Sequence, residues 1–237
     1  MKELSNPDSH LIKNLINYGL KDLTSTKREN IFKIMRKLYH FDKDVVGPQI
    51  SSNKDFPKII MVHINSEDKS NISENCFYLL AKLFNYQTFK SQIDEAFILA
   101  LFESLSFIPE EDILNEIVFI LTEINYEYKK PEENLFIKVH KENENSRVIN
   151  EIILRVLNNE EEDERKIKIL KCLDDLMSNY DKCIFYESDL ESLIDILLPK
   201  LQMTDNNQLK LKLLECLDKV TKYKEYYGEK YKVDEIS

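Results

Sequence analysis

Histidine and cysteine are the side chains of this sequence that could bind a metal or act as nucleophiles and bases, but they are scattered along it. They form no C-x-x-C or H-E-x-x-H motif, and there is no G-x-S-x-G turn or glycine-rich phosphate loop. A metal site needs ligands at close spacing or ligands that converge in the fold, and the spacing provides none. We therefore expect no catalytic, metal-binding or cofactor-binding residues and a protein that is not an enzyme; the alternative is an enzyme in which these side chains converge on a helical scaffold. The residues concerned are His10, His40, His63, His140, Cys76, Cys172, Cys183 and Cys216.

Two clusters of charge could instead bind a partner. The acidic run 160–164 could hold a cation or a basic segment, whereas the alternative is a solvated turn whose acids favour the N-terminus of a helix beginning near Arg165. We favour the turn. The stretch 219–232 alternates lysines with tyrosines, which could bind an acidic protein surface or cover the end of a helical stack. Both roles stay open for this second cluster.

The net charge argues against some classes of partner. The chain has 43 acidic and 33 basic residues, and its formal charge of −10 repels both nucleic acid and anionic lipid surfaces. Its longest apolar runs, near residues 97–102, are far shorter than the roughly 20 residues that cross a bilayer. The first nine residues are polar and do not resemble a secretory leader. We therefore expect a cytoplasmic protein with free thiols that binds no nucleic acid and does not insert into membranes.

Helices must position whatever surface does the work. A β-sandwich or barrel would need turn residues about every 8–12 positions, and this chain has only three glycines and six prolines. Apolar residues instead recur with the i, i+3, i+4, i+7 spacing of amphipathic helices. The stripes are Ile31, Phe32, Met35, Leu38 and Tyr39; Ile113, Leu114, Ile117, Val118, Ile120, Leu121 and Ile124; Val148, Ile149, Ile152, Ile153, Val156 and Leu157; Leu190, Leu193, Ile194, Leu197, Leu198 and Leu201; and Leu209, Leu213, Leu214, Leu217 and Val220.

Helix start signals precede several of these stripes. Thr26 and Glu29 have the spacing of a capping box, and Pro109 with the acids after it suits a first helical turn. Ser188 and Asp189 stand just before the stripe that begins at Leu190, where a capping side chain is favoured. Other signals occur at 70–74 and 205–207, so the chain is predicted to be a series of helices joined by short polar connections.

The helices are predicted to stack in pairs. Residues 76–84 and 96–105 are apolar almost all round, so these two helices must be covered on several sides, in the middle of a stack. Leu80 and Leu121 lie 41 residues apart, as do Leu173 and Leu214, and armadillo and HEAT repeats recur every ~40–47 residues. The polar stretch 128–145 is then expected to be an insertion. We predict one all-α domain over residues 1–237, an armadillo/HEAT-like helical solenoid of about four or five irregular repeats; the alternative is a non-repetitive helical globule.

Short motifs in the second half resemble a known family. Residues 185–196, FYESDLESLIDI, are similar to the F-Y-x-N-D-L-x-x-L-I-D-I element in the leucine-rich domain of the WISH/DIP/SPIN (Ldb-type) family. Flanking segments resemble other elements of that domain in the same order: LTEINYEY at 121–128, the helix at 150–159, LLECL at 213–217 and YKVDEI at 231–236. The resemblance spans residues 117–236, and the first half of the chain has no such motif.

The resemblance implies an armadillo-like domain that binds and activates the actin-related protein 2/3 complex. Activation in this family needs no preformed filament and gives a linear seed filament, whose pointed end the domain contacts only through the complex. It implies a place at the actin cortex or endocytic patches, and no cofactor. With neither an SH3 domain nor a proline-rich tract, the chain would be the minimal activating domain. The alternative is a generic armadillo or HEAT adaptor for another protein.

Partner-binding residues are expected on the exposed sides of the later helices. The acidic candidates beside the family element are Asp189, Glu191 and Asp195, and the basic candidates near the last helix are Lys219, Lys222 and Lys224. Phe185 and Tyr186 precede a helix as hydrophobic staples often do, so we expect both of them to anchor the core.

Overall fold

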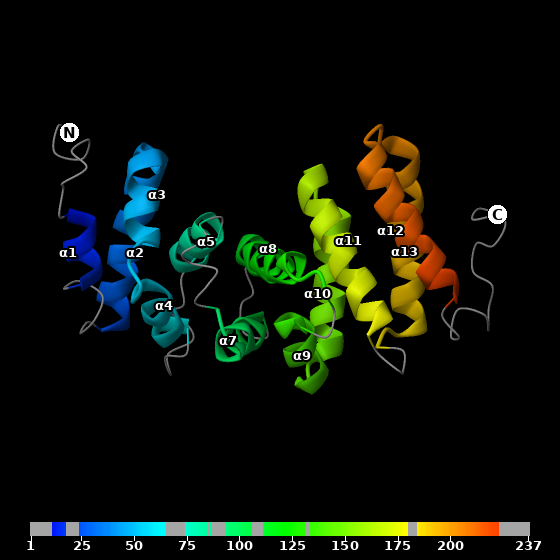
Figure 1. The fold of residues 1–237 in the computed structure, drawn as a ribbon, viewed down its shortest axis with the longest axis horizontal. Coiled ribbons are helices and arrows are strands. Elements are labelled where there is room, and N and C mark those ends of the chain that lie inside the picture. The colour runs from blue at the N-terminus through cyan, green and yellow to red at the C-terminus, as the bar shows by residue number, and fades with distance from the viewer. Residues whose placement is uncertain are drawn as a thin grey trace. The chain divides into compact units, whose positions relative to one another are not determined.

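All regular secondary structure in the described residues is helical (Figure 1), which confirms the all-α class expected of a helical solenoid. The computed structural model describes residues 11–17, 24–64, 74–84, 86, 93–105, 111–130, 133–179 and 184–222. The helices are α1 (Leu11–Asn17), α2 (Ser25–Phe41), α3 (Lys43–Ser51), α4 (Phe56–Ile64), α5 (Glu74–Leu83), α7 (Glu95–Leu105), α8 (Glu111–Glu127), α9 (Leu135–Glu142), α10 (Ser146–Asn159), α11 (Asp163–Ser178), α12 (Glu187–Met203) and α13 (Asn207–Lys222).

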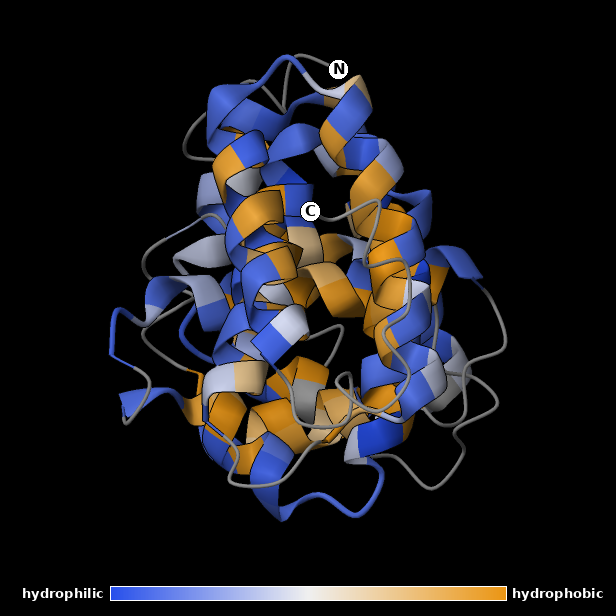
Figure 2. Cartoon of the chain, turned by 90° about the vertical axis from the view of Figure 1, so that its right-hand side faces the viewer, coloured by the Kyte–Doolittle hydropathy of each residue, from blue (hydrophilic) through white to orange (hydrophobic). Residues whose placement is uncertain are grey.

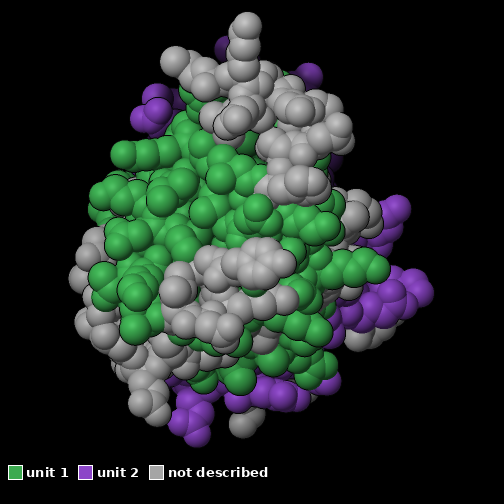
Figure 3. Space-filling view, turned by 90° about the vertical axis from the view of Figure 1, so that its left-hand side faces the viewer, with its two compact units in different colours: residues 1–120 green, residues 121–237 purple. Residues whose placement is uncertain are grey.

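The chain divides into two compact units, Met1–Ile120 and Leu121–Ser237, with the division inside α8 (Figure 3). Whether residues 1–237 act as one continuous domain stays a prediction, and each unit is described by itself. In both units the helices have an apolar side and a polar side (Figure 2), because apolar side chains recur at helical spacing and are removed from water together.

The first unit packs α2 against α3 and α5, α1 against α3, and α4 against α7. Its core is rich in phenylalanine, and the rings of Phe32 and Phe56 meet edge to face with centroids 6.3 Å apart. The expectation that α5 and α7 are covered on several sides is confirmed, except that Ala96 is exposed and Leu99 is 42% exposed. The buried residues of these two helices are Cys76, Phe77, Leu79, Leu80, Ala81, Leu83, Phe97, Ile98, Ala100, Leu101, Phe102 and Leu105.

The second unit contains two stacked helix pairs. α10 packs against both α11 and α12, and α13 packs against both α11 and α12. The pair α10–α11 is thus followed by the pair α12–α13, with α12 lying on α10 and α13 on α11. This arrangement buries a shared apolar seam between consecutive pairs, as in other helical stacks.

The 41-residue register that pairs Leu173 with Leu214 is wrong, although the spacing of the helices lies within the expected ~40–47 residues. α11 and α13 begin 44 residues apart and also end 44 residues apart. Leu173 is fully buried, whereas Leu214, its supposed counterpart at 41 residues, is 51% exposed. Val148, which belongs to another predicted stripe, is likewise 45% exposed. A stripe in the sequence shows which residues share a helix side, but it does not show whether a neighbouring helix covers its edges.

The stretch 128–145 was expected to be a polar insertion; its polar character is wrong, and whether it is an insertion between repeats stays a prediction. It contains α9, which buries Phe136, Ile137 and Val139. Asn134 caps this helix, since its Oδ1 accepts hydrogen bonds from the backbone N–H groups of Phe136 at 3.1 Å and Ile137 at 3.4 Å. The helix has only two turns, so its short apolar stripe is diluted by the polar residues on both sides.

The predicted helix starts were correct in part. α11 begins at Asp163, so Asp163 and Glu164 occupy its first turn and the acidic run is a helix boundary, as predicted. The capping box at Thr26 is wrong, because α2 already begins at Ser25 and its N-cap is Thr24. Glu29 instead accepts a hydrogen bond from Asn75 of α5, at 2.7 Å. The signals at Pro109 and at 70–73 lie outside the described residues.

Candidate protein-binding groove

The outward sides of α10 and α12 enclose an open groove of about 440 Å³ in the second unit. Because α12 lies on α10, the polar stripe of one helix faces the polar stripe of the other across this groove. The lining residues are Glu151, Leu154, Arg155, Asn158, Asp189, Ser192, Asp195 and Ile196. We call this surface the α10–α12 groove.

The charge of the α10–α12 groove is negative overall. Its lining contains the carboxylates of Glu151, Asp189 and Asp195 and the single guanidinium of Arg155. Leu154 is buried at its floor and Ile196 is partly exposed, so apolar contact is available between the charges. A groove of this composition suits a segment with basic and apolar side chains, because exposed carboxylates steer and orient cations.

One end of the groove is fixed by a buried hydrogen-bond chain. His140 of α9 lies with Nε2 2.9 Å from Oδ1 of Asn150 in α10, and the Asn150 Nδ2 group donates to the Ile184 carbonyl at 3.2 Å. Since Asn150 donates with its amide nitrogen, its oxygen accepts from His140. Burial lowers the pKa of His140 to about 4, so the imidazole is neutral at pH 7. The chain positions residue 184 and hence the start of α12.

The start of α12 carries an exposed aromatic side chain. Phe185 is buried, as predicted, but Tyr186 is 48% exposed, so the expectation that it anchors the core is wrong. The Arg147 guanidinium lies 4.4 Å from the centre of the Tyr186 ring, in cation–π contact. The backbone N–H of Tyr186 donates to Oδ2 of Asp189 at 2.8 Å, so Asp189 both caps α12 and lines the groove.

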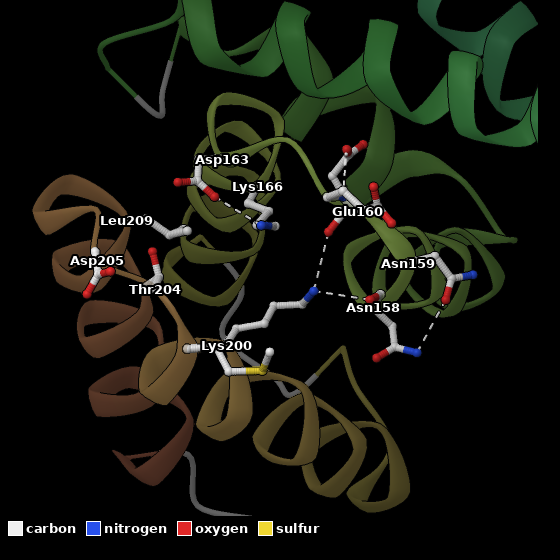
Figure 4. A pocket seen from close by; sticks show the side chains of 11 residues that line it. Asn158, Asn159, Glu160, Asp163, Lys166, Lys200, Thr204, Asp205 and Leu209 are labelled. Atoms are coloured by element: carbon white, nitrogen blue, oxygen red, sulfur yellow. Dashed lines mark hydrogen bonds and ion pairs between the residues drawn. The ribbon is translucent and has the colours of Figure 1, made fainter.

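The other end of the groove is fixed by Lys200 of α12 (Figure 4). Its Nζ donates to the carbonyl oxygens of Asn158, at 3.1 Å, and Glu160, at 3.4 Å, at the C-terminus of α10. Burial and the nearby Lys166 lower the pKa of Lys200. The pair of contacts at Ile184 and Lys200 therefore holds α12 in register on α10, so the groove is a preformed surface.

A second cavity, of about 520 Å³, opens beyond this clamp (Figure 4). The groups in it are already engaged with one another. Asp163 accepts from Lys166 at 3.0 Å and from Asn206 at 3.1 Å. We therefore treat this cavity as part of the support of the helix ends and not as a site.

Buried polar contacts hold α11 in place within the second unit. Lys168 forms an ion pair with Glu123 at 2.5 Å, and their side chains are only 12% and 4% exposed. Lys171 donates to the Asn125 carbonyl at 3.1 Å and pairs with Asp175 at 2.5 Å. These contacts fix α11, on which α10 and α13 pack.

The structure separates the six predicted contact residues. Asp189 and Asp195 line the groove together, whereas Glu191 of the same helix is partly exposed and is not among the lining residues. Lys219 pairs with Asp174 of α11 at 2.5 Å and thereby ties α13 to α11. Lys222 pairs with Asp218 one turn earlier, at 2.5 Å. Lys224 lies outside the described residues.

Sequence reasoning missed the half of the groove that α10 supplies. The polar groove residues of α10 lie on the side of the helix opposite its apolar stripe. They are Glu151, Arg155 and Asn158, at i, i+4 and i+7 spacing. That spacing could have been found, because it repeats with the helical period. Its meeting with α12 could not, because nothing in the local pattern specifies which helix lies alongside.

Neither a metal cluster nor a membrane-spanning helix is present in the described part of the chain. No group of three or more His, Cys, Asp and Glu side chains converges there. No helix in that part is long and apolar enough to cross a bilayer. Cys76, Cys172 and Cys216 are buried thiols, and burial raises the pKa of each of them.

In the described residues, the second unit is thus a pair of stacked helix pairs with a polar groove between α10 and α12. A family model described as "SPIN90/Ldb17, leucine-rich domain" matches residues 110–236, more than half of the chain and all of the α10–α12 groove. The chain belongs to the SPIN90/Ldb17 family. No match was found among curated proteins.

Proposed function

We propose that this chain activates the actin-related protein 2/3 complex and so nucleates linear seed filaments without a preformed filament. Membership of the SPIN90/Ldb17 family suggests an actin-related adaptor role, and the proposal adds the partner and the outcome to that coarser role. An armadillo-like stack, action at the actin cortex or endocytic patches, and the absence of any catalytic step are parts of the same proposal.

The observation that carries the proposal is the α10–α12 groove inside the matched stretch. It is acidic, it has apolar positions between its charges, and both of its ends are clamped by hydrogen bonds. A surface that is already ordered loses little entropy when a partner binds, so more of the contact energy remains as affinity. The expected occupant is a basic, partly apolar segment of the complex.

Activation requires more than binding. A ligand shifts a conformational equilibrium only by its difference in affinity for the two states, so the groove must prefer the active arrangement of the complex. A stiff surface can do this, because it fits one arrangement of the partner and cannot adapt to the other. No nucleotide or metal has to be held by this chain for that mechanism.

The test is a pyrene-actin assembly assay with the purified complex and no preformed filament. Glu151→Lys combined with Asp195→Lys reverses charge on both sides of the groove and leaves Asp189 to cap α12. We expect about a tenfold or greater rise in the concentration needed for half-maximal acceleration, since each reversed charge opposes a cation of the partner. Glu142→Lys with Glu144→Lys, two exposed acids outside the groove lining, is the matched control.

Two outcomes would contradict the proposal. If the unmodified chain fails to accelerate assembly, activation is refuted and the adaptor hypothesis for another partner remains. If both pairs of variants lose activity equally while their melting curves match that of the parent, the groove is not the contact surface and only net charge matters.

A further inference from the structure

The outward side of α2 in the first unit is basic, although the chain as a whole is acidic. Lys33, Arg36, Lys37 and His40 share one side of the helix at i, i+3, i+4 and i+7 spacing. Residues 30–41 contain no carboxylate, in a chain of formal charge −10. Lys33, Lys37 and His40 are exposed and Arg36 is partly exposed. Residues 30–41 of α2 therefore contain no acidic side chain that could neutralise this basic side of the helix.

A tyrosine of α5 gathers the cations of this surface. The ring of Tyr78 has the Arg36 guanidinium 4.4 Å from its centre and the Lys82 ammonium 5.3 Å from it. The His40 ring stacks on it at a centroid distance of 5.0 Å and an angle of 29°. Arg36 also donates to Asn75 at 3.3 Å. Cation–π contact and this hydrogen bond hold the basic groups in place before any partner arrives.

Two carboxylates act on residues of this cluster. Glu29 of α2 accepts the hydrogen bond from Asn75 at 2.7 Å. Glu116 of α8 acts on Tyr78 through its charge, and with burial it raises the pKa of the tyrosine, against the lowering by Arg36. Neither acid lies among the outward positions of α2, where Lys33, Lys37 and His40 are exposed.

Large apolar side chains accompany the cations. Phe41 is 62% exposed and Ile34 is 47% exposed. With Lys37 they follow the i, i+3, i+7 spacing of one side of α2, next to Lys33 and His40. We call the surface formed by Lys33, Ile34, Arg36, Lys37, His40 and Phe41 of α2 with Tyr78 and Lys82 of α5 the α2–α5 basic face.

We propose that the α2–α5 basic face binds an acidic, amphipathic segment of a partner protein. Its exposed lysines, Lys33 and Lys37, match carboxylates on such a segment. Phe41 and Ile34 lie two turns apart and match apolar side chains at the same spacing on the segment. Arginine, tyrosine and phenylalanine are the residues enriched where proteins contact proteins.

This inference is independent of the proposed function. The α2–α5 basic face lies before residue 110, where the family match begins. It concerns a partner of opposite charge to the one expected for the α10–α12 groove. Either proposal can therefore fail while the other holds.

The test is fluorescence anisotropy of a labelled synthetic peptide with the full chain. The probe is a 15-residue amphipathic helix with glutamates on one side and leucine and phenylalanine on the other. Lys33→Glu with Lys37→Glu leaves the Arg36–Tyr78 contact in place, and we expect about a tenfold or greater loss of affinity at low salt. Lys54→Glu with Lys58→Glu, two exposed lysines elsewhere in the same unit, should change it by about twofold at most, since only the long-range field alters. Phe41→Ser should weaken binding with no change in the salt dependence.

Three results would overturn the proposal. The first is an equal loss for the two lysine pairs. The second is binding that does not weaken as salt rises, because charge would then not carry it. The third is sedimentation of the chain with phosphatidylserine vesicles through Lys33 and Lys37 in the absence of peptide binding, which would assign the face to a membrane surface. Matching melting curves for both pairs exclude unfolding as the cause of any difference.

Discussion

α11 and α13 share a similar nine-residue stretch but have very different surroundings. Residues 166–174, KIKILKCLD, align with residues 210–218, KLKLLECLD, at the 44-residue period of the second unit. Ile169, Cys172 and Leu173 and their counterparts Leu213, Cys216 and Leu217 are all buried. At these positions the two helices are equivalent.

The next stripe round the helix is where the two differ. Ile167 and Leu170 of α11 are buried, whereas their counterparts Leu211 and Leu214 are 55% and 51% exposed. In α11 this stripe is flanked by Asp163 and Asp174, which are bonded to Asn206 and Lys219 at the two ends of α13. The stripe of α11 is thus covered by the following repeat. Within the described residues, the matching stripe of α13 has no following repeat over it.

The difference shows that a helix of a solenoid can have apolar stripes for two neighbouring repeats even where only one of the stripes is covered. Apolar area is worth free energy only where another surface removes it from water. Equivalent residues of the two helices should therefore differ in their contribution to stability, and the size of each difference measures one kind of contact.

Leu170→Ala and Leu214→Ala should give the largest difference. Leu170→Ala leaves a cavity between α11 and its neighbours and should lower the free energy of unfolding by about 3 kcal/mol. Leu214→Ala removes a half-exposed side chain and should cost less than about 1 kcal/mol. Urea unfolding of both variants measures the two values. Similar costs would mean that Leu214 is covered in solution, and dependence of its cost on protein concentration would identify a second copy as the cover.

Lys168→Ala and Lys212→Ala compare two lysines at the same repeat position. Removal of Lys168 leaves Glu123, whose side chain is 4% exposed, without its ion-pair partner, and should cost about 2–3 kcal/mol. Lys212 pairs with Glu215 on its own helix, with both side chains more than 30% exposed, and its removal should cost less than about 0.5 kcal/mol. Thermal and urea unfolding check both. Restoration of stability by Glu123→Gln in the Lys168→Ala background would show that the unpaired charge is the cause, whereas no restoration would contradict this account.

The sequence predicted the sides of the helices better than their neighbours. Periodicity identified the buried stripes of α8 and α12, because 3.6-residue spacing is a property of one helix. It could not show that Leu214 and Val148 lack a cover, or that Lys219 is occupied by Asp174, because these depend on a second helix. Asp189 and Asp195 were found through the resemblance, while the α10 side of their groove needed the packing of α10 on α12.

Interior and terminal helices should also differ in how their contribution to stability depends on pH. No charged side chain of α13 is buried, whereas His140 is fully buried against α10 and its pKa is about 4. Its folded pKa lies below the ordinary value of 6.5, so the unfolded chain binds more protons as the pH falls below that value, and stability is lost from there toward pH 4. At pH 5 this loss should be on the order of 2 kcal/mol relative to pH 7.5.

His140→Gln tests this contribution, because glutamine keeps a donor for Asn150 and does not titrate. The difference in stability between pH 7.5 and pH 5 should be smaller in the variant than in the parent. His63 of the first unit also has a pKa of about 4, mainly because of burial. Because His63 contributes the same pH dependence to the parent and to the variant, the difference between the two proteins isolates His140. An unchanged pH dependence would show that His140 does not titrate as proposed.

The smallest expected difference is between Asp174→Asn and Asp218→Asn, which again occupy equivalent positions. Asp174 pairs with Lys219 across two helices, with side chains 26% and 32% exposed, so its loss should cost about 1 kcal/mol at low salt. Asp218 pairs with Lys222 within α13, with side chains 59% and 67% exposed, so its loss should cost about 0.3 kcal/mol. Unfolding in 0.05 M and 1 M salt separates the cases, since the partly buried pair is screened less. If the two variants were equally mild at both salt concentrations, the Lys219 contact would not hold α13 on α11, and this lysine would be available to a partner.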